Sequence, residues 1–187
     1  MYNIPYFKAE NDSEIIDFIH AHPFIMLCGV DSNGNPVATH VPVLIETREG
    51  KLYLTGHLMR NQEHTVAYQN NPNVLAIFLG KHYYVSATLY PISNVASTWN
   101  YKAVHAKGRI QFMDDNDLYH LLNKLTNHFE GSESSPASVK NMSPEYVQNN
   151  MKAIVGFEIE VTDLQHVFKD SQNKDEESRQ KIKKQYE

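Results

Sequence analysis

The residues best suited to chemistry lie between Leu52 and Gly80, where polar groups follow an apolar stretch. Thr55-Gly56-His57 closes an alternating apolar run, and Arg60-Asn61-Gln62 opens a predicted helix. The first turn of a helix offers unpaired N–H donors and a partial positive charge, and an arginine adds a forked, charge-assisted donor. The hydroxyl of Thr55, the guanidinium of Arg60 and the amides of Asn61 and Gln62 could together bind a phosphate ester at the start of this helix. An ordinary polar turn between a strand and a helix is the alternative interpretation.

Other chemistries find less support in the residues. The chain has ten histidines but neither an HExxH nor a CxxC pattern, and His57 and His64 share a helical spacing with no third ligand implied, so no metal site is expected. No Ser/His/Asp order or carboxylate pair indicates hydrolysis. The one cysteine, Cys28, lies inside the apolar run Phe24–Val30, which predicts a buried free thiol and a reducing, cytoplasmic setting.

Composition limits the class of protein. A chain of 187 residues with 41% hydrophobic and 21% charged residues fits one soluble domain with a sizeable core. The N-terminus lacks a basic region followed by an apolar core, and no apolar run approaches the length of a membrane span. The net charge of −5 argues against a broad basic face for a phosphate backbone, so direct DNA binding by this chain alone is not expected.

The elements that must position these residues are mostly short strands. A capping box at Asn11-Asp12-Ser13-Glu14 predicts a first helix that ends before Pro23, and Ser143-Pro144-Glu145 starts a later one. Helices are also expected over 62–69, after Asp114-Asp115, and in the tail. Strands are expected over 24–30, 37–45, 52–55, 74–79, 83–86, 103–112 and 154–161, with a turn at 80–82. This order predicts a mainly β (α+β) fold, an antiparallel barrel of six to seven strands with peripheral helices.

Several segments in this order resemble one family, and together they cover nearly the whole chain. They are Ala38-Thr39-His40-Val41-Pro42, Thr55-Gly56-His57-Leu58 with Arg60-Asn61, Gly80-Lys81-His82-Tyr83-Tyr84-Val85-Ser86, Trp99-Asn100-Tyr101 with Val104-His105 and Gly108, Ile154-Val155-Gly156-Phe157, and Ser171-Gln172-Asn173. The chain resembles the PaiB family of FMN-binding negative transcriptional regulators. The resemblance implies an FMN-binding split β-barrel, a homodimer with flavin sites between subunits, and repression of sporulation and degradative-enzyme genes.

The resemblance also implies where the flavin lies. Arg60 would pair with the ribityl phosphate, and Thr55 and Gly56 would let the backbone approach the flavin because glycine has no Cβ. The full set of expected cofactor-binding residues is His40, Pro42, Thr55, Gly56, His57, Arg60, Asn61, Gln62, Tyr84, Ser86 and Trp99. Some of these residues also have a purely structural interpretation. His57 could cap a helix, Tyr84 could pack at the rim of the barrel, and Trp99 could anchor an interface.

One segment departs from the family pattern. Where relatives carry an Asn-Pro-Gln-Trp-like stretch, this chain has Asn61-Gln62-Glu63-His64. An acidic Glu63 that pointed toward the phosphate would weaken flavin binding through like-charge repulsion.

Two further functions stay open from the sequence. A flavin or a haem carries its own redox chemistry, so a flavin- or haem-dependent oxidoreductase acting on a small molecule would show no catalytic motif. A cofactor-free barrel that binds a protein partner is the other. The expected organisation is one split-barrel domain over 1–170 with N-terminal and inserted helices, followed by a helical tail over 171–187.

Overall fold

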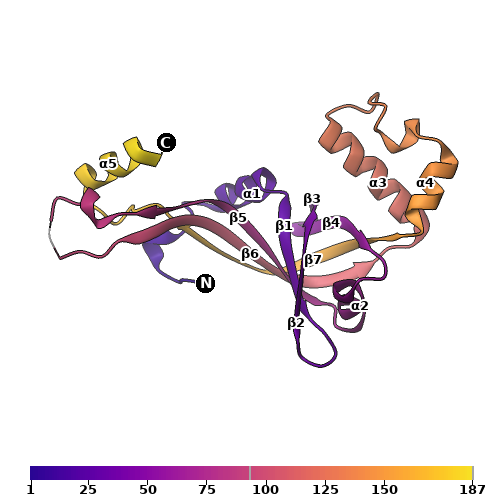
Figure 1. The fold of residues 1–187 in the computed structure, drawn as a ribbon, viewed down its shortest axis with the longest axis horizontal. Helices are drawn as coiled ribbons and strands as arrows, with labels where there is room; N and C mark the ends of the chain where they lie inside the picture. The colour runs from indigo at the N-terminus through magenta and orange to yellow at the C-terminus, as the bar shows by residue number, and fades with distance from the viewer. Residues whose placement is uncertain (93, 187) are drawn as a thin grey trace. The chain divides into compact units, whose positions relative to one another are not determined.

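The structure is a computed structural model that describes residues 1–92 and 94–186. Ser93, in a predicted loop, and Glu187, at the end of the predicted tail, lie outside the described residues. Within that range the strands are β1 Phe24–Val30, β2 Pro36–Pro42, β3 Leu44–Arg48, β4 Lys51–Met59, β5 Asn73–Val85, β6 Thr98–Phe112 and β7 Ile154–Lys169. The helices are α1 Asp12–Ala21, α2 Glu63–Asn70, α3 Asp115–Glu130, α4 Pro144–Met151 and α5 Glu176–Tyr186, with short 3₁₀ turns at Pro5–Phe7, Ala87–Leu89 and Val139–Asn141 (Figure 1).

The strands form one sheet in the order β2-β1-β5-β6-β7-β4-β3. Its two edge strands, β2 and β3, are separated by the single residue Val43, whose backbone N–H donates to the Pro23 carbonyl at 2.9 Å. A sheet whose edges are one residue apart must curl round on itself, which is the split-barrel arrangement. The predicted barrel of six to seven strands is therefore confirmed.

The chain divides into two compact units, and each is described by itself. Unit 1 comprises residues 1–22, 78–105 and 165–187, and unit 2 comprises residues 23–77 and 106–164.

The β1–β2 hairpin of unit 2 forms around an aspartate. One carboxylate oxygen of Asp31 accepts from the N–H groups of Asn33 and Asn35, each at 2.8 Å, and Gly34 takes a φ of +86°. This turn sets the register that pairs Met26 with His40. The predicted strand over 24–30 is confirmed, but its side chains alternate between buried and outward-facing, and Cys28 is half-buried instead of buried as predicted. Its buried side carries Ile25 and Leu27.

Strand β4 has an inner and an outer side. Leu54 and Leu58 point into the core beside Phe157 and Ile159 of β7, with which β4 pairs antiparallel. Helix α3 covers the outer side of the sheet, where its Leu121 and Leu125 pack on Leu44 of β3, the neighbour of β4. The helical spacing of these leucines predicts such an apolar face.

Unit 1 contains α1, α5 and the parts of β5, β6 and β7 within its bounds. Helix α5 buries Ile182 against Val85 and Tyr90, and the Tyr186 ring stacks on Tyr83 with centroids 4.4 Å apart. The tail helix is thus anchored by apolar contacts.

The predicted break in β5 is wrong. Gly80 lies inside a continuous strand, and a Cβ at this position would stand 2.8 Å from the Phe18 ring. Glycine is present because α1 approaches the strand closely there, and it does not mark a turn. The expected single strand over 37–45 is likewise two strands, divided at Val43.

Candidate functional site

Six of the expected site residues lie at the end of β4 and between β4 and α2. Thr55 and His57 lie on the outer side of the strand, the side that α3 covers, while Gly56 lies on the inner side. A Cβ on Gly56 would stand 2.8 Å from the Phe157 ring and 2.9 Å from the Pro42 carbonyl oxygen. Gly56 therefore lets β4 approach Pro42 and Phe157 of the same chain.

His57 is the most unusual polar group on this strand. Its Nδ1 is buried and has no hydrogen-bond partner among the described residues. Burial lowers the pKa of the imidazole below its usual range, so the ring is neutral at pH 7. A buried ring nitrogen without a partner costs free energy, and a bound group that supplied the missing hydrogen bond would recover it.

Arg60 follows directly after β4 and is held by its backbone. Its N–H donates to the Ala153 carbonyl at 2.8 Å, while its guanidinium lies 3.4 Å from the Asp115 carboxylate, which is 83% exposed. One long contact with a solvated carboxylate leaves most of the five guanidinium donors available.

The start of α2 adds backbone donors beside Arg60. Gln62 is the N-cap residue, and its side chain makes no capping hydrogen bond. Asn61 and Gln62 are exposed. Thr65 donates from its hydroxyl to the Met59 carbonyl at 2.8 Å, which fixes the first turn of α2 against the end of β4. The start of a helix is where an anion can bind, and the assignment of Arg60, Asn61 and Gln62 to a phosphate stays a prediction.

Glu63 is the acidic residue that departs from the family pattern. It lies in the first turn of α2 and is exposed to solvent. The neighbouring His64 is partly buried, which lowers the pKa of its ring, while the charge of Glu63 acts in the opposite direction.

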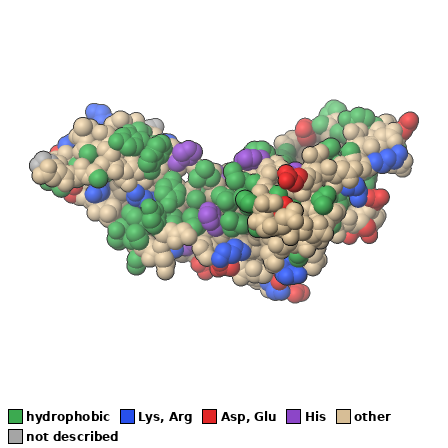
Figure 2. All heavy atoms as spheres, turned by 60° about the horizontal axis from the view of Figure 1, so that its bottom comes forward, with side chains coloured by type: hydrophobic (Ala, Val, Ile, Leu, Met, Phe, Trp, Pro, Cys, Tyr) green, Lys and Arg blue, Asp and Glu red, His purple; other side chains and the backbone are tan. Residues whose placement is uncertain are grey.

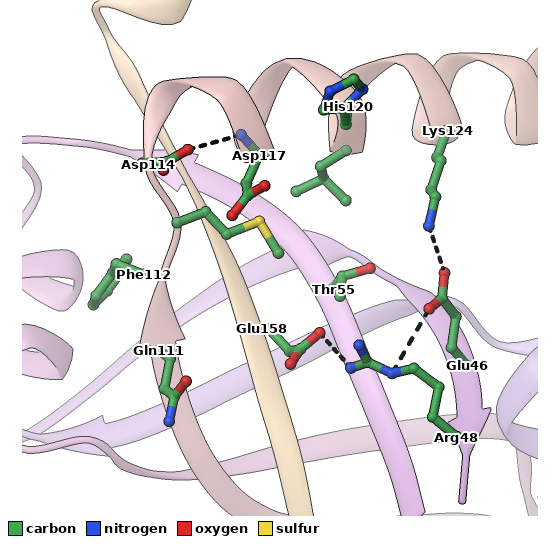
Figure 3. A pocket seen from close by; sticks show the side chains of 12 residues that line it. Glu46, Arg48, Thr55, Gln111, Phe112, Asp114, Asp117, His120, Lys124 and Glu158 are labelled. Atoms are coloured by element: carbon green, nitrogen blue, oxygen red, sulfur yellow. Dashed lines mark hydrogen bonds and ion pairs between the residues drawn. The ribbon is translucent and has the colours of Figure 1, made fainter.

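A cavity of about 640 Å³ lies between α3 and the outer side of the sheet, next to Thr55 (Figure 3). The buried Thr55 side chain reaches it from β4. Arg48 forms ion pairs with Glu158 and with Glu46, and Glu46 also binds Lys124 at 3.2 Å. These charged residues were not predicted. The pattern that could have revealed them is the pair Glu46 and Arg48, two residues apart on one strand face.

His40 and Pro42 also belong to unit 2, on the hairpin. They pair with Met26 and Phe24 of β1, and the His40 ring stacks over Phe24 with centroids 5.9 Å apart. His40 is exposed and Pro42 is half-buried.

The remaining three expected residues belong to unit 1. Tyr84 and Trp99 are exposed and meet edge to face with centroids 5.9 Å apart. Ser86 caps the 3₁₀ turn at Ala87–Leu89, where its hydroxyl oxygen accepts from the Thr88 N–H.

Two negative observations concern the described part of the chain. Residues 1–92 and 94–186 contain no group of three or more histidine, cysteine or acidic side chains placed to hold a metal ion. None of the helices in this part combines the length and apolar character needed to cross a membrane.

Comparison with known proteins identifies the family. The family model described as "Putative FMN-binding domain" matches residues 1–163. The chain belongs to this family. It is 33% identical over 176 residues to "Protease synthase and sporulation protein PAI 2" of Bacillus subtilis (strain 168), covering 94% of this chain and 84% of that protein. The predicted membership of the PaiB family is thereby confirmed.

Solved structures support the same fold. The "FAD and Heme binding protein" of Mycobacterium smegmatis superposes with a TM-score of 0.65 at 14% identity, covering 91% of this chain and 77% of the other. "Flavocytochrome Anf3" of Azotobacter vinelandii gives a TM-score of 0.65 at 16% identity, covering 95% and 77%. At such identities the likeness concerns the fold alone.

Proposed function

We propose that this protein binds FMN at the end of β4. The observation that carries the proposal is the combination of an available Arg60 guanidinium with the uncapped start of α2, in a chain whose residues 1–163 match a family named for FMN binding. Arg60, Asn61 and Gln62 would hold the phosphate, and the unpartnered Nδ1 of His57 suits a polar atom of the flavin. Bound FMN would supply electron transfer, and this chain's residues would bind and orient it.

The other expected residues would act in flavin sites as the resemblance implies. They are His40, Pro42 and Thr55 of unit 2 and Tyr84, Ser86 and Trp99 of unit 1, while Gly56 faces Phe157 and Pro42 within unit 2. Because the sites are expected between subunits, either copy of the chain can supply these groups.

The working form would be a homodimer. Phe24, Met26 and Val30 expose 64%, 37% and 37% of their surface along the outer side of β1. Leu75 and Ile77 of β5 continue that row, since Ile77 pairs with Met26 and Leu75 with Cys28. Figure 2 shows hydrophobic side chains exposed on one face of the molecule. The family resemblance implies that a second copy of the chain covers these apolar residues. A two-fold interface would bury the same residues of both copies.

The biological role would be negative regulation of sporulation and degradative-enzyme genes, as the resemblance to the PaiB family implies; the Bacillus subtilis relative is named a "Protease synthase and sporulation protein". With a net charge of −5 the action on these genes would be indirect. The free thiol of Cys28 fits a cytoplasmic location. A flavin- or haem-dependent oxidoreductase is the rival, because two of the similar folds are named for a flavocytochrome and for FAD and haem binding.

The absorbance spectrum of the purified protein tests the cofactor, followed by titration of the cofactor-free protein with FMN and with riboflavin. The proposal expects flavin bands and tighter binding of FMN, because Arg60 acts on the phosphate. A Soret band with no flavin would overturn it in favour of haem, and equal affinities for FMN and riboflavin would remove Arg60 from the site.

A further inference from the structure

A cavity of about 410 Å³ lies wholly within unit 1, and none of the residues expected to bind the flavin lines it. This volume is within the range of small-molecule sites. Its lining comes from the N-terminal segment, from Tyr90 and residues 95–98, and from the end of β7 with the turn that follows it. We call it the N-terminal cavity, because Tyr2, Ile4 and Phe7 form part of its wall.

Two lysine ammonium groups lie against the wall of this cavity. The Nζ of Lys169 donates to the Thr98 hydroxyl, and it lies 5.6 Å from the centre of the Phe7 ring. The Nζ of Lys174 lies over the Tyr90 ring, 4.7 Å from its centre. Because Thr98, Phe7 and Tyr90 all line the cavity, both positive charges are held at its surface.

Within the described part of the chain, no acid pairs with these two lysines. None of the described residues that line the cavity is acidic, and no described carboxylate lies within 4.0 Å of either ammonium group. The acids next to them in the chain have other partners. Asp170 accepts from the Tyr83 hydroxyl at 2.7 Å. Asp175 accepts from the N–H and the hydroxyl of Ser178, at 2.9 and 2.7 Å.

The two lysine charges also act on each other. Both side chains are half-buried. Burial lowers the pKa of the Lys169 ammonium, and the charge of Lys174 lowers it further. Like charges at a half-buried place cost free energy, and an anion bound near both would offset that cost because opposite charge favours the protonated amine.

The turn after β7 fixes the backbone that carries both lysines. The Lys174 N–H donates to the Ser171 carbonyl at 2.9 Å, and the Gln172 side chain accepts from a backbone N–H of the same turn at 2.7 Å. Ser171 has a φ of +56°, a left-handed backbone that a residue with a side chain adopts only when its surroundings impose it. Its hydroxyl exchanges hydrogen bonds of 3.0 and 3.1 Å with the buried Asn100. The Ser171-Gln172-Asn173 motif therefore has a positioning role for this cavity.

Apolar side chains supply much of the remaining wall. Phe7 and Tyr90 are 5% and 8% exposed, so their rings are fixed by the packing of unit 1. Ile4 and Val95 are half-buried and line the same cavity. An apolar wall beside two ammonium groups suits a molecule that has an apolar body and one acidic end, because each part then meets matching surface.

We infer that the N-terminal cavity binds a small organic acid with an apolar body, at a site separate from the proposed FMN site. Lys169 and Lys174 hold the acidic end as point charges. Phe7, Ile4 and Val95 contact the apolar body and remove it from water.

The test is calorimetric titration of the full chain with octanoate and octyl phosphate, which differ in the acidic end, and with octanamide, which has the same apolar body without a charge. At least one of the two acids is expected to bind once per chain, about tenfold or more tightly than octanamide, because a hydrogen bond to a charged group is worth that much. Acetate and inorganic phosphate, which lack the apolar body, should each bind more weakly than the octyl compound.

A double variant assigns the binding to the two lysines. Lys169→Gln/Lys174→Gln should lose about tenfold or more in affinity for the acid. Lys181→Gln/Lys184→Gln removes the same number of charges from exposed positions of α5 that do not line the cavity, and it should bind the acid normally. Thermal denaturation without ligand shows that each variant is folded.

Three results would overturn the inference. No binding of either acid, or affinities equal to that of octanamide, would show that the lysines meet no acidic end, and this comparison needs no variant. Unchanged affinity in Lys169→Gln/Lys174→Gln would place the ligand elsewhere. Loss of acid binding when the protein is loaded with FMN would show that the two sites are not separate. If the protein takes up no FMN, the FMN proposal fails, while the titrations of the cofactor-free chain still test the cavity.

Discussion

The backbone N–H of Ala9 donates a 2.9 Å hydrogen bond to Nε2 of His166, near the end of β7. Nε2 can accept only while it carries no proton, so this contact requires a neutral imidazole. The Lys8 ammonium donates to the His166 carbonyl at 3.2 Å, so two consecutive residues of the N-terminal segment attach to one histidine.

Stability should therefore fall on mild acidification. Burial and the charge of Lys8 lower the pKa of His166, outweighing Glu14 and Asp12, and burial also lowers the pKa of His57. A group with a depressed folded-state pKa binds fewer protons when folded, so its contribution is present above the unfolded pKa of about 6.5 and is lost as pH falls toward the folded value. Urea denaturation at several pH values below about 7 measures this loss.

His166→Gln tests the assignment to this histidine. The amide oxygen of glutamine can still accept a hydrogen bond but does not titrate, so the fall in stability between about pH 7 and about pH 5.5 should become smaller than in the native chain. A His20→Gln variant, which changes a histidine in the last turn of α1, serves as control. An identical pH profile for His166→Gln and the native protein would contradict the prediction.

Arg60→Ala should weaken FMN binding about tenfold or more, because a hydrogen bond to a charged group contributes roughly 1.5–3 kcal/mol. Fluorescence titration of flavin measures the affinity. Arg109→Ala removes another arginine of unit 2, whose side chain is exposed on β6, and should leave the affinity unchanged. Equal losses in both variants would indicate a general charge effect.

Gly56→Ala separates two roles for this glycine. A Cβ would stand 2.8 Å from Phe157 and 2.9 Å from the Pro42 carbonyl, so we expect the cofactor-free protein itself to lose about 1–3 kcal/mol of stability. Thermal denaturation without flavin measures the loss. If the substitution lowered stability only in the presence of FMN, Gly56 would be required for FMN binding and not for packing of the core.

Met26→Lys should convert the proposed dimer to a monomer, because it places a charge in the centre of the exposed apolar row of β1. Sedimentation equilibrium distinguishes the native dimer from a 21.5 kDa monomer. Tyr146→Lys places the same charge on an exposed aromatic residue of α4 and should remain dimeric. A native protein that already sediments as a monomer would remove the dimer from the proposal.

The purified protein should bind duplex DNA weakly and without sequence preference at physiological salt. The net charge is −5, and the basic cluster Lys181–Lys184 lies on α5 together with Glu176 and Glu177, which pair with Arg179 and Lys181. A footprinting assay on a candidate promoter measures this. Specific binders reach about 10⁻⁸ M, and a footprint at that concentration would restore direct repression.

Local patterns predicted most of the elements of this fold. The capping box at Asn11 does cap α1, where the side chain of Asn11 accepts from the Glu14 N–H, and Asp114 and Ser143 cap α3 and α4 in the same way. These features depend on residues a few positions apart, so the sequence reveals them directly.

Errors arose where a distant segment decides the structure. Gly80 looks like a turn residue until α1 is seen to pass over it, and the role of Gly56 in packing depends on Phe157, far away in the chain. For the same reason the sequence could not show that Arg60 meets Asp115 or that Thr55 faces a cavity under α3. The assignment of flavin-binding residues stays a prediction.

The pairing of β4 with β7 has a consequence for the order in which the protein can fold during synthesis. Tyr53 pairs with Glu160, so β4 is made long before the strand that covers its second edge. Until residues 154–160 leave the ribosome, the β3–β4 hairpin has one unpaired side, which is a template for pairing with other chains. A nascent chain that stalls before β7 is therefore the species most exposed to aggregation, and assistance from a chaperone would matter most during that interval.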